Sequence, residues 1–475
     1  MAPIAPLARP QRSRRTMVNQ SYASTLGNFV ASLRYESLPA STVHAVRRHL
    51  LDTLGAAIAG AAQPEPQATW RAARASFGLS AGAAIWGRNG VAAPAVAALV
   101  NGTAAHALEL DDASGCDHSG AVVVPAVLAA LASPGASTDG QVVVAAIAAG
   151  YDVARRVMEA SGGYDGHNGA GWHSTGTCGV FGAAAAVARI LGCDAAVTAN
   201  ALAIAGSFSS GTWAFLADGA MTKRMHPGHA ASAGLLAVEM SRAGLSGPTQ
   251  VFEATWGGFF NTYAPGCGEP PLLVADLGSE WRIHRSSIKP YASCRGTHAA
   301  VEAVIALRER LGADEIEGVT VEVTATVEKM CRNKDVRNFV DAQMSLPYTV
   351  SVALIHGAAD VDQFDEETRR DPRVRAMMDR IHVTAIDGLP SNVAARVSVR
   401  MRDGARHALA IDVPLGSPGN PLAQEALERK FHSMADRVLG RTAAEALTAA
   451  VSRLGEHGDA AGLPALTQPS PIKDC

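Results

Sequence analysis

The run Gly179-Val-Phe-Gly-Ala-Ala-Ala-Ala-Val-Ala-Arg-Ile-Leu191 contains one charged residue and consists mostly of alanine and glycine. Alanine favours helix, and helices lined by small residues can approach one another closely. Apolar residues repeat at helical spacing on the N-terminal side as well, over Val122 to Leu131 and over Val142 to Met158, which Asp139 is placed to cap. The run therefore predicts a tightly packed domain made only of helices.

Helical patterning covers most of residues 21–269. Ser41 is the expected N-cap of a helix that ends at Gly60, and Pro94 starts another helix that stops at Gly102. The pattern returns over Pro421 to Ala450. We therefore predict one large helical domain built from two separate segments of the chain, residues 21–269 and 416–460.

A different pattern begins near Pro270. Residues that alternate with polar ones at strand spacing are Val319, Val321, Val323, Ala325 and Val327. Asp403-Gly404 is a hairpin turn signal between two further strand-like segments, Arg396–Met401 and His407–Val413. We predict an α+β lid domain over residues 270–415, so that the fold class is mainly α with a smaller α+β part.

The composition excludes several classes of protein. A net charge of −3 over 475 residues provides no basic surface for nucleic acid, and the longest apolar runs are too short to span a membrane. Seven cysteines without a CxxC pair argue against a disulfide framework, a zinc ribbon or an iron–sulfur cluster, and favour the reducing cytoplasm. Residues 1–20 and 461–475, which contain several prolines, are expected to be disordered.

An anion-binding segment is expected at Met221-Thr-Lys-Arg-Met-His-Pro-Gly-His-Ala230, which gathers two cations and two imidazoles. It precedes a helix expected over residues 230–239, whose free N–H groups and dipole add positive potential. We predict that Lys223 and His226 belong to a site. The alternative is a basic helix start that faces solvent.

A cluster of acids and an imidazole lies between two expected helices. Its members are Glu109, Asp111, Asp112, Asp117 and His118. Acids beside an imidazole can orient it and raise its pKa, which suits acid–base catalysis. One alternative is a solvated loop with an incidental histidine. Another is a metal site made by Asp111, Asp112, His118 and His173, but no HExxH or similar spacing supports it, and no metal is expected.

Two further segments could face the same cleft. Gly169 to Gly176 surrounds His173 with small residues, which let a ligand approach the backbone, although a structural role for His173 is the alternative. The second segment, before a helix, contributes Lys289, Tyr291, Cys294 and Arg295. Cys294 could be a nucleophile, but we favour the binding of a polycarboxylate by these residues.

Taken in order, these clusters resemble the MmgE/PrpD family. The matching segments are Leu51–Gly55, Asn101-Gly102 through Asp111-Asp112, His118–Gly120, Gly171–His173, Lys223–Gly228, Lys289–Tyr291 with Cys294-Arg295 and Thr297-His298, and Gln343–Tyr348. The likeness extends from about Ser21 to Gly455. Family members include 2-methylcitrate dehydratases, cis-aconitate decarboxylases and an iminodisuccinate epimerase.

The resemblance implies an active site between a helical domain and an α+β lid, in a homodimer that works without metal or organic cofactor. It assigns His118, His173, Lys223 and Asp111 to catalysis. It also matches Asp112 and Lys289 to positions of the family's site. Together with the clusters described above, this leads us to predict that substrate is bound by Asp112, His226, Lys289, Tyr291, Cys294 and Arg295. We expect the partner to be a small polycarboxylate substrate, with no nucleic acid and no membrane.

Three hypotheses about function follow. The first is a cofactor-independent lyase of the 2-methylcitrate dehydratase or cis-aconitate decarboxylase type, in which histidine moves a proton next to a carboxylate held by Lys or Arg. The second is an epimerase of an iminodisuccinate-like dicarboxylate. The third is a polycarboxylate-binding protein without catalysis, which would need the cations but neither His118 nor His173.

Overall fold

The computed structural model describes residues 21–77, 82–311, 315–456 and 458–470. Predictions made for residues 1–20 and 471–475 lie outside the described residues. Among the described helices, none is long and apolar enough to cross a membrane.

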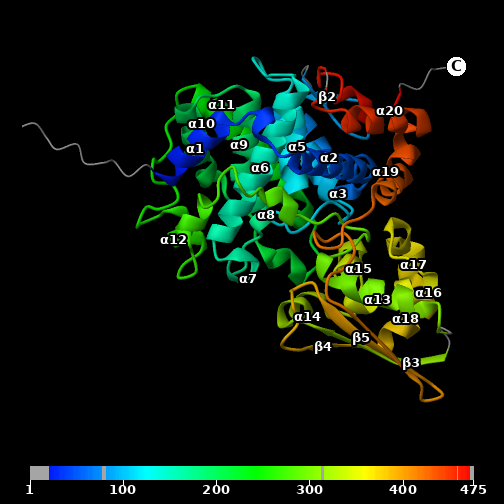
Figure 1. Cartoon of the computed structure of the whole chain (residues 1–475). Coiled ribbons are helices and arrows are strands. Elements are labelled where there is room, and N and C mark those ends of the chain that lie inside the picture. The colour runs from blue at the N-terminus through cyan, green and yellow to red at the C-terminus, as the bar shows by residue number, and fades with distance from the viewer. Residues whose placement is uncertain (1–20, 78–81, 312–314, 457, 471–475) are drawn as a thin grey trace, which may run out of the picture.

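Most helices belong to one large helical body (Figure 1). They are α1 (Tyr22–Ser32), α2 (Ala40–Gly60), α3 (Pro64–Phe77), α4 (Pro94–His106), α5 (Ser119–Ala130), α6 (Gly140–Ala160), α7 (Gly163–His167), α8 (Ser174–Thr177), α9 (Gly179–Ile190), α10 (Ala195–Ala205), α11 (Thr222–Arg242), α12 (Phe259–Tyr263), α19 (Gln424–Leu439) and α20 (Arg441–Ser452). A short hairpin, β1 (Ala83–Ala84) with β2 (Val91–Ala92), lies at one side.

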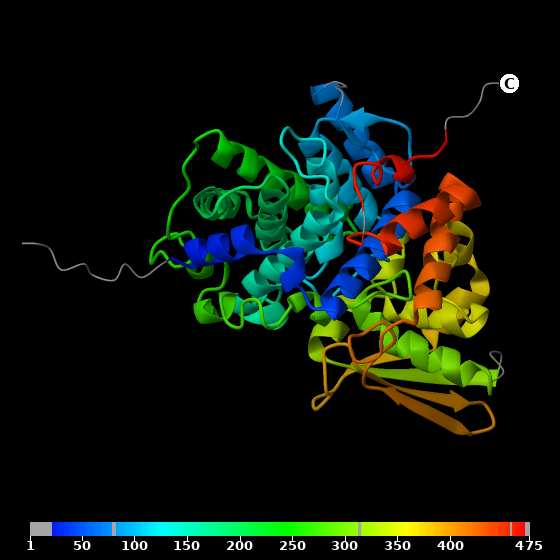
Figure 2. The same ribbon diagram turned by 45° about the horizontal axis from the view of Figure 1, so that its top comes forward.

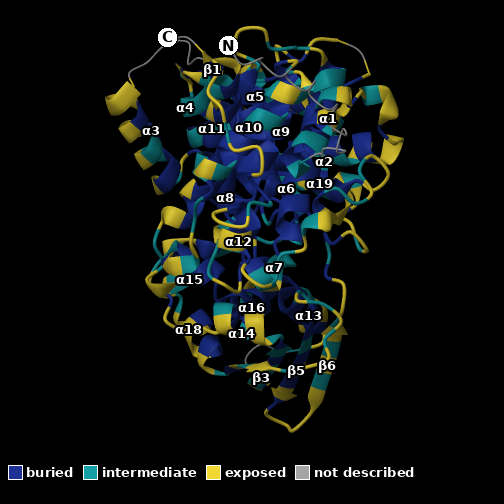
Figure 3. Ribbon diagram, turned by 90° about the vertical axis from the view of Figure 1, so that its left-hand side faces the viewer, coloured by how far each residue is buried: buried dark blue, intermediate teal, exposed yellow. Residues whose placement is uncertain are grey.

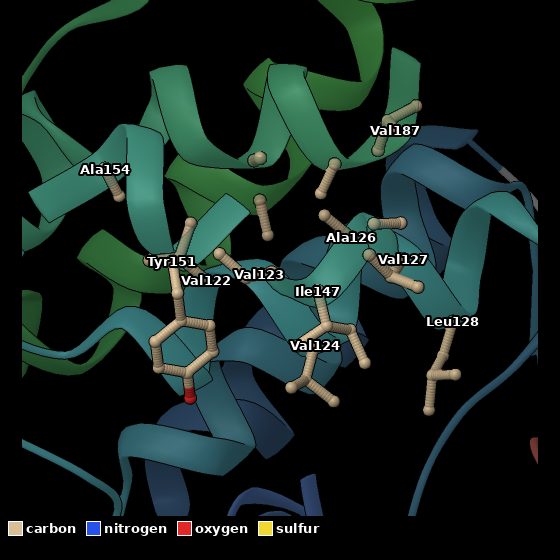
Figure 4. Close-up of a cluster of buried hydrophobic side chains, with 14 of the residues drawn as sticks. Val122, Val123, Val124, Ala126, Val127, Leu128, Ile147, Tyr151, Ala154 and Val187 are labelled. Carbon is tan, nitrogen blue, oxygen red and sulfur yellow. The ribbon is translucent and has the colours of Figure 1, made fainter. Parts of the chain in front are cut away.

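The core of this body is made of small side chains. Valines and alanines of α5 pack with Ile147 and Tyr151 of α6 (Figure 4). Helices α6 and α9 approach so closely that a Cβ atom at Gly182 would lie 2.5 Å from the carbonyl oxygen of Gly150. The alanine-rich run quoted first is helix α9, it is almost completely buried, and the predicted mainly helical fold is confirmed.

A smaller α+β region carries the sheet. Its elements are α13 (His298–Arg308), β3 (Ile316–Val323), α14 (Ala325–Cys331), α15 (Phe339–Gln343), α16 (Leu346–His356), α17 (Glu366–Arg370), α18 (Pro372–Asp379), β4 (Ile381–Ala385), β5 (Ala395–Met401) and β6 (Arg406–Ile411). The strand order is β4-β3-β5-β6, with β3 and β4 parallel and the other pairs antiparallel. Helices α13, α16 and α18 lie between the sheet and the helical body (Figure 1). The end of the molecule that the sheet forms, away from the helical body, carries many exposed residues (Figure 3).

Two hydrophobic clusters accompany this arrangement. The first joins α1–α6 and α9–α11 with α19 and α20, and the second contains the α+β region together with Leu108, Leu110 and Met434. Helix α19 packs against α2 although more than 360 residues separate them along the chain (Figure 2). These contacts favour a helical domain made from two segments, whose boundaries at 269/270 and 415/416 stay a prediction.

Several predicted elements have other limits. The strand expected over 319–327 ends at Val323, because Thr324 caps helix α14 by accepting the N–H of Val327, so Val327 is helical. Helix α2 starts after Pro39 rather than at a Ser41 cap, and α4 continues through Gly102.

The segment from residue 458 to 470 is also ordered, although disorder was predicted from residue 461. Thr467 is buried, and its carbonyl oxygen accepts the N–H of Gly87 at 2.8 Å. The Gln468 side chain donates to the carbonyl oxygen of Gly90 at 2.6 Å. Hydrogen bonds to the β1–β2 hairpin therefore hold this segment despite its prolines.

Candidate active site

The site is built around the loop that joins α4 to α5. Of the four described non-glycine residues with positive φ, three lie in this loop: Glu109 (53°), Ser114 (61°) and Asp117 (110°). Such backbone conformations persist only where the surroundings enforce them, and they concentrate at functional sites. The loop lies against helix α11 and the α+β region, which hold it through buried charges.

Glu109 is the centre of a buried charge cluster. Its carboxylate accepts hydrogen bonds from Lys223 and Arg224 of α11, and from Lys289 at 3.1 Å. All four side chains are nearly inaccessible to solvent. Burial alone would raise the pKa of Glu109, but the three cations hold it well below its usual range. With three positive charges against one negative charge, the cluster keeps a positive excess.

The two lysines differ in their pKa. Burial lowers the pKa of Lys223 despite the attraction of Glu109, whereas for Lys289 the attraction of Glu109 and Asp111 outweighs burial and raises the pKa. Gln343 of α15, in the α+β region, connects Arg224 of α11 with the loop that carries Glu109. Its side-chain oxygen accepts from Arg224 at 2.7 Å, and its amide donates to the carbonyl oxygen of Leu108 at 2.6 Å.

Asp111 bridges two imidazoles. Its carboxylate lies 3.0 Å from Nδ1 of His106 and 3.2 Å from Nδ1 of His118, which also contacts the carbonyl oxygen of Asp112 at 2.7 Å. Both acceptors place the proton of His118 on Nδ1, which leaves Nε2 facing Asp117 at 3.6 Å. Burial opposes a charged His118, but Asp117 and Asp111 outweigh it and raise its pKa above the ordinary value of 6.5. The surroundings of His118 therefore favour its charged form.

His173 is the neutral imidazole. Burial lowers its pKa to about 4, and burial lowers the pKa of its neighbour His226 to about 3. The two Nδ1 atoms lie 2.8 Å apart, so one of them donates to the other. The Nε2 atom of His173 lies 3.5 Å from Asp117, whose pKa is lowered. Because an ionised Asp117 requires a donor, we assign the proton of His173 to Nε2 and that of His226 to Nδ1.

A cavity of about 240 Å³ opens onto this arrangement. Its polar lining includes Glu109, Asp117, His118 and Lys223. Its apolar lining comes from both regions: Met158 and Trp213 from the helical body, Val327, Met330 and Val393 from the α+β region. The cavity thus lies between the two regions, with charge and imidazoles on one side and a hydrocarbon wall on the other.

The structure brings together most of the predicted site residues. His118, Lys223, Cys294 and Arg295 line the cavity, although the guanidinium of Arg295 donates to the carbonyl oxygens of Pro414 and Leu415. A hydrogen bond from Cys331 lowers the pKa of the Cys294 thiol. The residues that lie directly behind this lining are Asp111, His173, His226 and Lys289.

Two predicted residues are placed elsewhere. Asp112 accepts the N–H of Gly120 at 3.0 Å and lies 3.4 Å from His49, so its carboxylate fixes the start of α5. The ring of Tyr291 packs edge-on against His298 and is not part of the cavity lining. Neither position gives geometric support to the predicted role in substrate binding.

Three contributors were not singled out from the sequence, namely His106, Trp213 and Tyr164. His106 follows an alanine-rich apolar run where a lone histidine is unremarkable, and Trp213 and Tyr164 carried no motif of their own, whereas Arg224 belongs to the predicted anion-binding segment. His106, His118 and His173 each offer one nitrogen, and these atoms lie within 4.8 Å of one another. Two of the Nδ1 atoms are held by Asp111, so the geometry suits proton handling beside a bound anion.

Two family models match the chain. The model described as the MmgE/PrpD N-terminal domain matches residues 24–268, and the one described as the MmgE/PrpD C-terminal domain matches residues 291–456. The chain belongs to the MmgE/PrpD family. The boundary between the two matches lies in the segment that connects the helical body to the α+β region.

Similar proteins cover nearly the whole chain. The cis-aconitate decarboxylase of Aspergillus terreus is 27% identical over 97% of this chain and 97% of its own length. The human cis-aconitate decarboxylase is 28% identical over 96% of both chains. The cis-aconitate decarboxylase-like protein oryM of Aspergillus oryzae is 26% identical over 93% of this chain and 96% of its own length.

Proposed function

We propose that this MmgE/PrpD protein is a cofactor-independent lyase that acts on a small di- or tricarboxylate, with cis-aconitate as its first substrate to test. The observation that carries the proposal is the pair of imidazoles on either side of Asp117, one with a raised and one with a lowered pKa. Paired titratable groups whose pKa values are pushed apart are typical of acid–base sites. The names of the similar proteins support a lyase.

In a decarboxylation, the bond between a carboxylate carbon and the skeleton breaks, carbon dioxide leaves, and the electron pair remains on the skeleton. The positive excess around Glu109, with Lys223 at the cavity wall, would stabilise that negative charge. His118, cationic and with Nε2 facing the cavity side, would donate the proton that completes the product. It would then recover a proton from solvent.

His173 has a supporting role in this mechanism. As a neutral donor from Nε2 it would hold Asp117 beside His118, and Asp117 in turn keeps His118 protonated. Met158, Val327 and Met330 would cover the carbon skeleton and exclude water, which strengthens each electrostatic interaction in the cavity. The homodimer, the absence of a cofactor and the cytoplasmic location stay predictions.

The test is a screen of cis-aconitate, 2-methylcitrate, citrate and iminodisuccinate, followed by variants on whichever compound reacts. His118→Gln should lower kcat by about 10²–10⁴-fold, because it removes the acid. Lys223→Met should raise KM more than it lowers kcat if the lysine binds substrate and transition state alike. His382→Gln, an exposed histidine on β4, is the control.

Carbon dioxide release from cis-aconitate supports the decarboxylase form of the proposal, and water elimination from 2-methylcitrate supports dehydration. Epimerisation of iminodisuccinate, or no turnover of any compound by folded protein, would contradict a lyase. A His118→Gln variant with the kcat of the His382→Gln control would contradict the role of His118.

A further inference from the structure

A second cavity, of about 490 Å³, lies on the other side of the catalytic loop. We call it the reverse cavity. Leu108 and Leu110 line it, whereas Glu109 between them lines the active-site cavity. One stretch of three residues is therefore a shared wall, with alternate side chains directed to opposite cavities.

Two more connections cross this wall. Pro290 lines the reverse cavity, and Lys289 immediately before it binds Glu109 at 3.1 Å. Lys430 of α19 also lines the reverse cavity, and its ammonium group donates to the carbonyl oxygen of Leu110 at 2.7 Å. It also binds the carboxylate of the buried Asp52 of α2 at 2.5 Å. A ligand in the reverse cavity would thus contact the residues that hold the catalytic loop.

The charges of the reverse cavity favour an anion. Asp362 is neutralised by Arg437 at 2.8 Å, and the lining holds two further cations, Arg429 and Lys430, against one further carboxylate, Asp360. Arg429 is exposed and, within the described ranges, has no acidic partner. Beside it the wall is apolar, with Ala59, Leu108, Leu110, Met434 and Val438.

We propose that the reverse cavity is a regulatory site for a small organic anion with an apolar body. Its anionic group would bind Arg429 and draw Lys430 away from the carbonyl oxygen of Leu110, while its apolar body packs on Leu108 and Leu110. The loop that holds Glu109 then loosens and activity falls. Coupling between two such sites typically changes the affinity of one site for its ligand by about five- to 150-fold when the other site is occupied. The reverse cavity is separate from the cavity in which the proposed reaction would take place.

The probe is 8-anilino-1-naphthalenesulfonate, an organic anion with an apolar body, added to the full chain. Its fluorescence titration should give saturable binding that Arg429→Glu weakens by at least tenfold. The matched control is Arg453→Glu, which reverses an exposed charge at the end of α20 and should leave binding unchanged. The uncharged analogue N-phenyl-1-naphthylamine should bind more weakly than the sulfonate.

Hydrogen–deuterium exchange gives the second readout, and it needs no activity. Bound probe should speed exchange at residues 108–112 in the wild type but not in Arg429→Glu. For any substrate that the screen identifies, bound probe should lower kcat/KM at least fivefold. Equal binding by Arg429→Glu, displacement of the probe by the substrate analogue tricarballylate, or unchanged exchange at 108–112 would overturn the proposal. Conversion of a dimer to monomers by Arg429→Glu would also overturn it, by showing that a second copy covers the cavity.

Discussion

Replacing Glu109 by glutamine tests the charge cluster at the centre of the site. The substitution keeps the size of the side chain and removes the negative charge that three buried cations share. At an effective dielectric constant of about 20, the attraction between unit charges at the 3.1 Å separation of Glu109 and Lys289 is about 5 kcal/mol. Breaking a buried pair by removing one partner costs about 3–5 kcal/mol in measured cases. We expect the free energy of unfolding to fall by that amount at pH 7.

The loss should depend on pH in a defined direction. Without Glu109, the buried lysines bind their protons more weakly in the folded than in the unfolded chain, where the lysine pKa is near 10.5. Stability rises with pH wherever the unfolded state binds more protons. The deficit of Glu109→Gln relative to the wild type should therefore shrink between pH 7 and pH 10, as the lysines lose protons.

Urea titrations followed by tryptophan fluorescence at both pH values measure this deficit. Glu239→Gln is the matched control, because it removes an acid from the exposed pair with Arg242 on α11. Exposed pairs contribute about 0–1 kcal/mol. The reasoning fails if Glu109→Gln loses no more stability than Glu239→Gln, or if its deficit is the same at pH 7 and pH 10.

Further measurements test other parts of the site. The value of kcat/KM should fall below about pH 4, where His173 gains a proton, and should fall again at a pH above 6.5, where His118 loses its proton. A flat pH profile from pH 3 to 9 would exclude both roles. Lys430→Met should lower kcat and shift the pH above which kcat/KM falls, whereas Lys430→Arg should have the kcat and the pH profile of the wild type. If Lys430→Met loses stability but keeps the wild-type pH profile, the role of Lys430 is only structural. Gly228→Ala should destabilise the protein by about 1–3 kcal/mol in urea titrations, since its Cβ would lie 2.1 Å from the carbonyl oxygen of Leu99; wild-type stability would contradict the close packing of α4 and α11.

The sequence predicted the residue types of the site better than their partners. Lys223 was expected to bind an anion, and in the structure its partner is a carboxylate of the same chain, that of Glu109, 114 residues away. Spacing along a sequence gives no information on such a contact. The helix there was expected from Ala230 and starts at Thr222, so it runs through Pro227, whose missing N–H leaves one backbone hydrogen bond of the helix unmade.

The fold was predictable where one signal dominated. Alanine-rich apolar runs could only be buried helices, as α9 shows, and the Asp403-Gly404 turn does join β5 to β6. Predictions failed where two local signals competed. Val327 continued an alternating pattern, but Thr324 offered a helix cap, and the cap decided the structure.

The bond between Lys430 and the carbonyl oxygen of Leu110 has a consequence for synthesis of the protein, because 320 residues separate its two ends. At translation rates of about 5–20 residues per second, Lys430 is made roughly 16–64 seconds after the loop that it supports. During that interval α2 also lacks α19, and Asp52 lacks its cation. A nascent chain can therefore form α4 to α11 early, yet it acquires a supported catalytic loop only after α19 has left the ribosome.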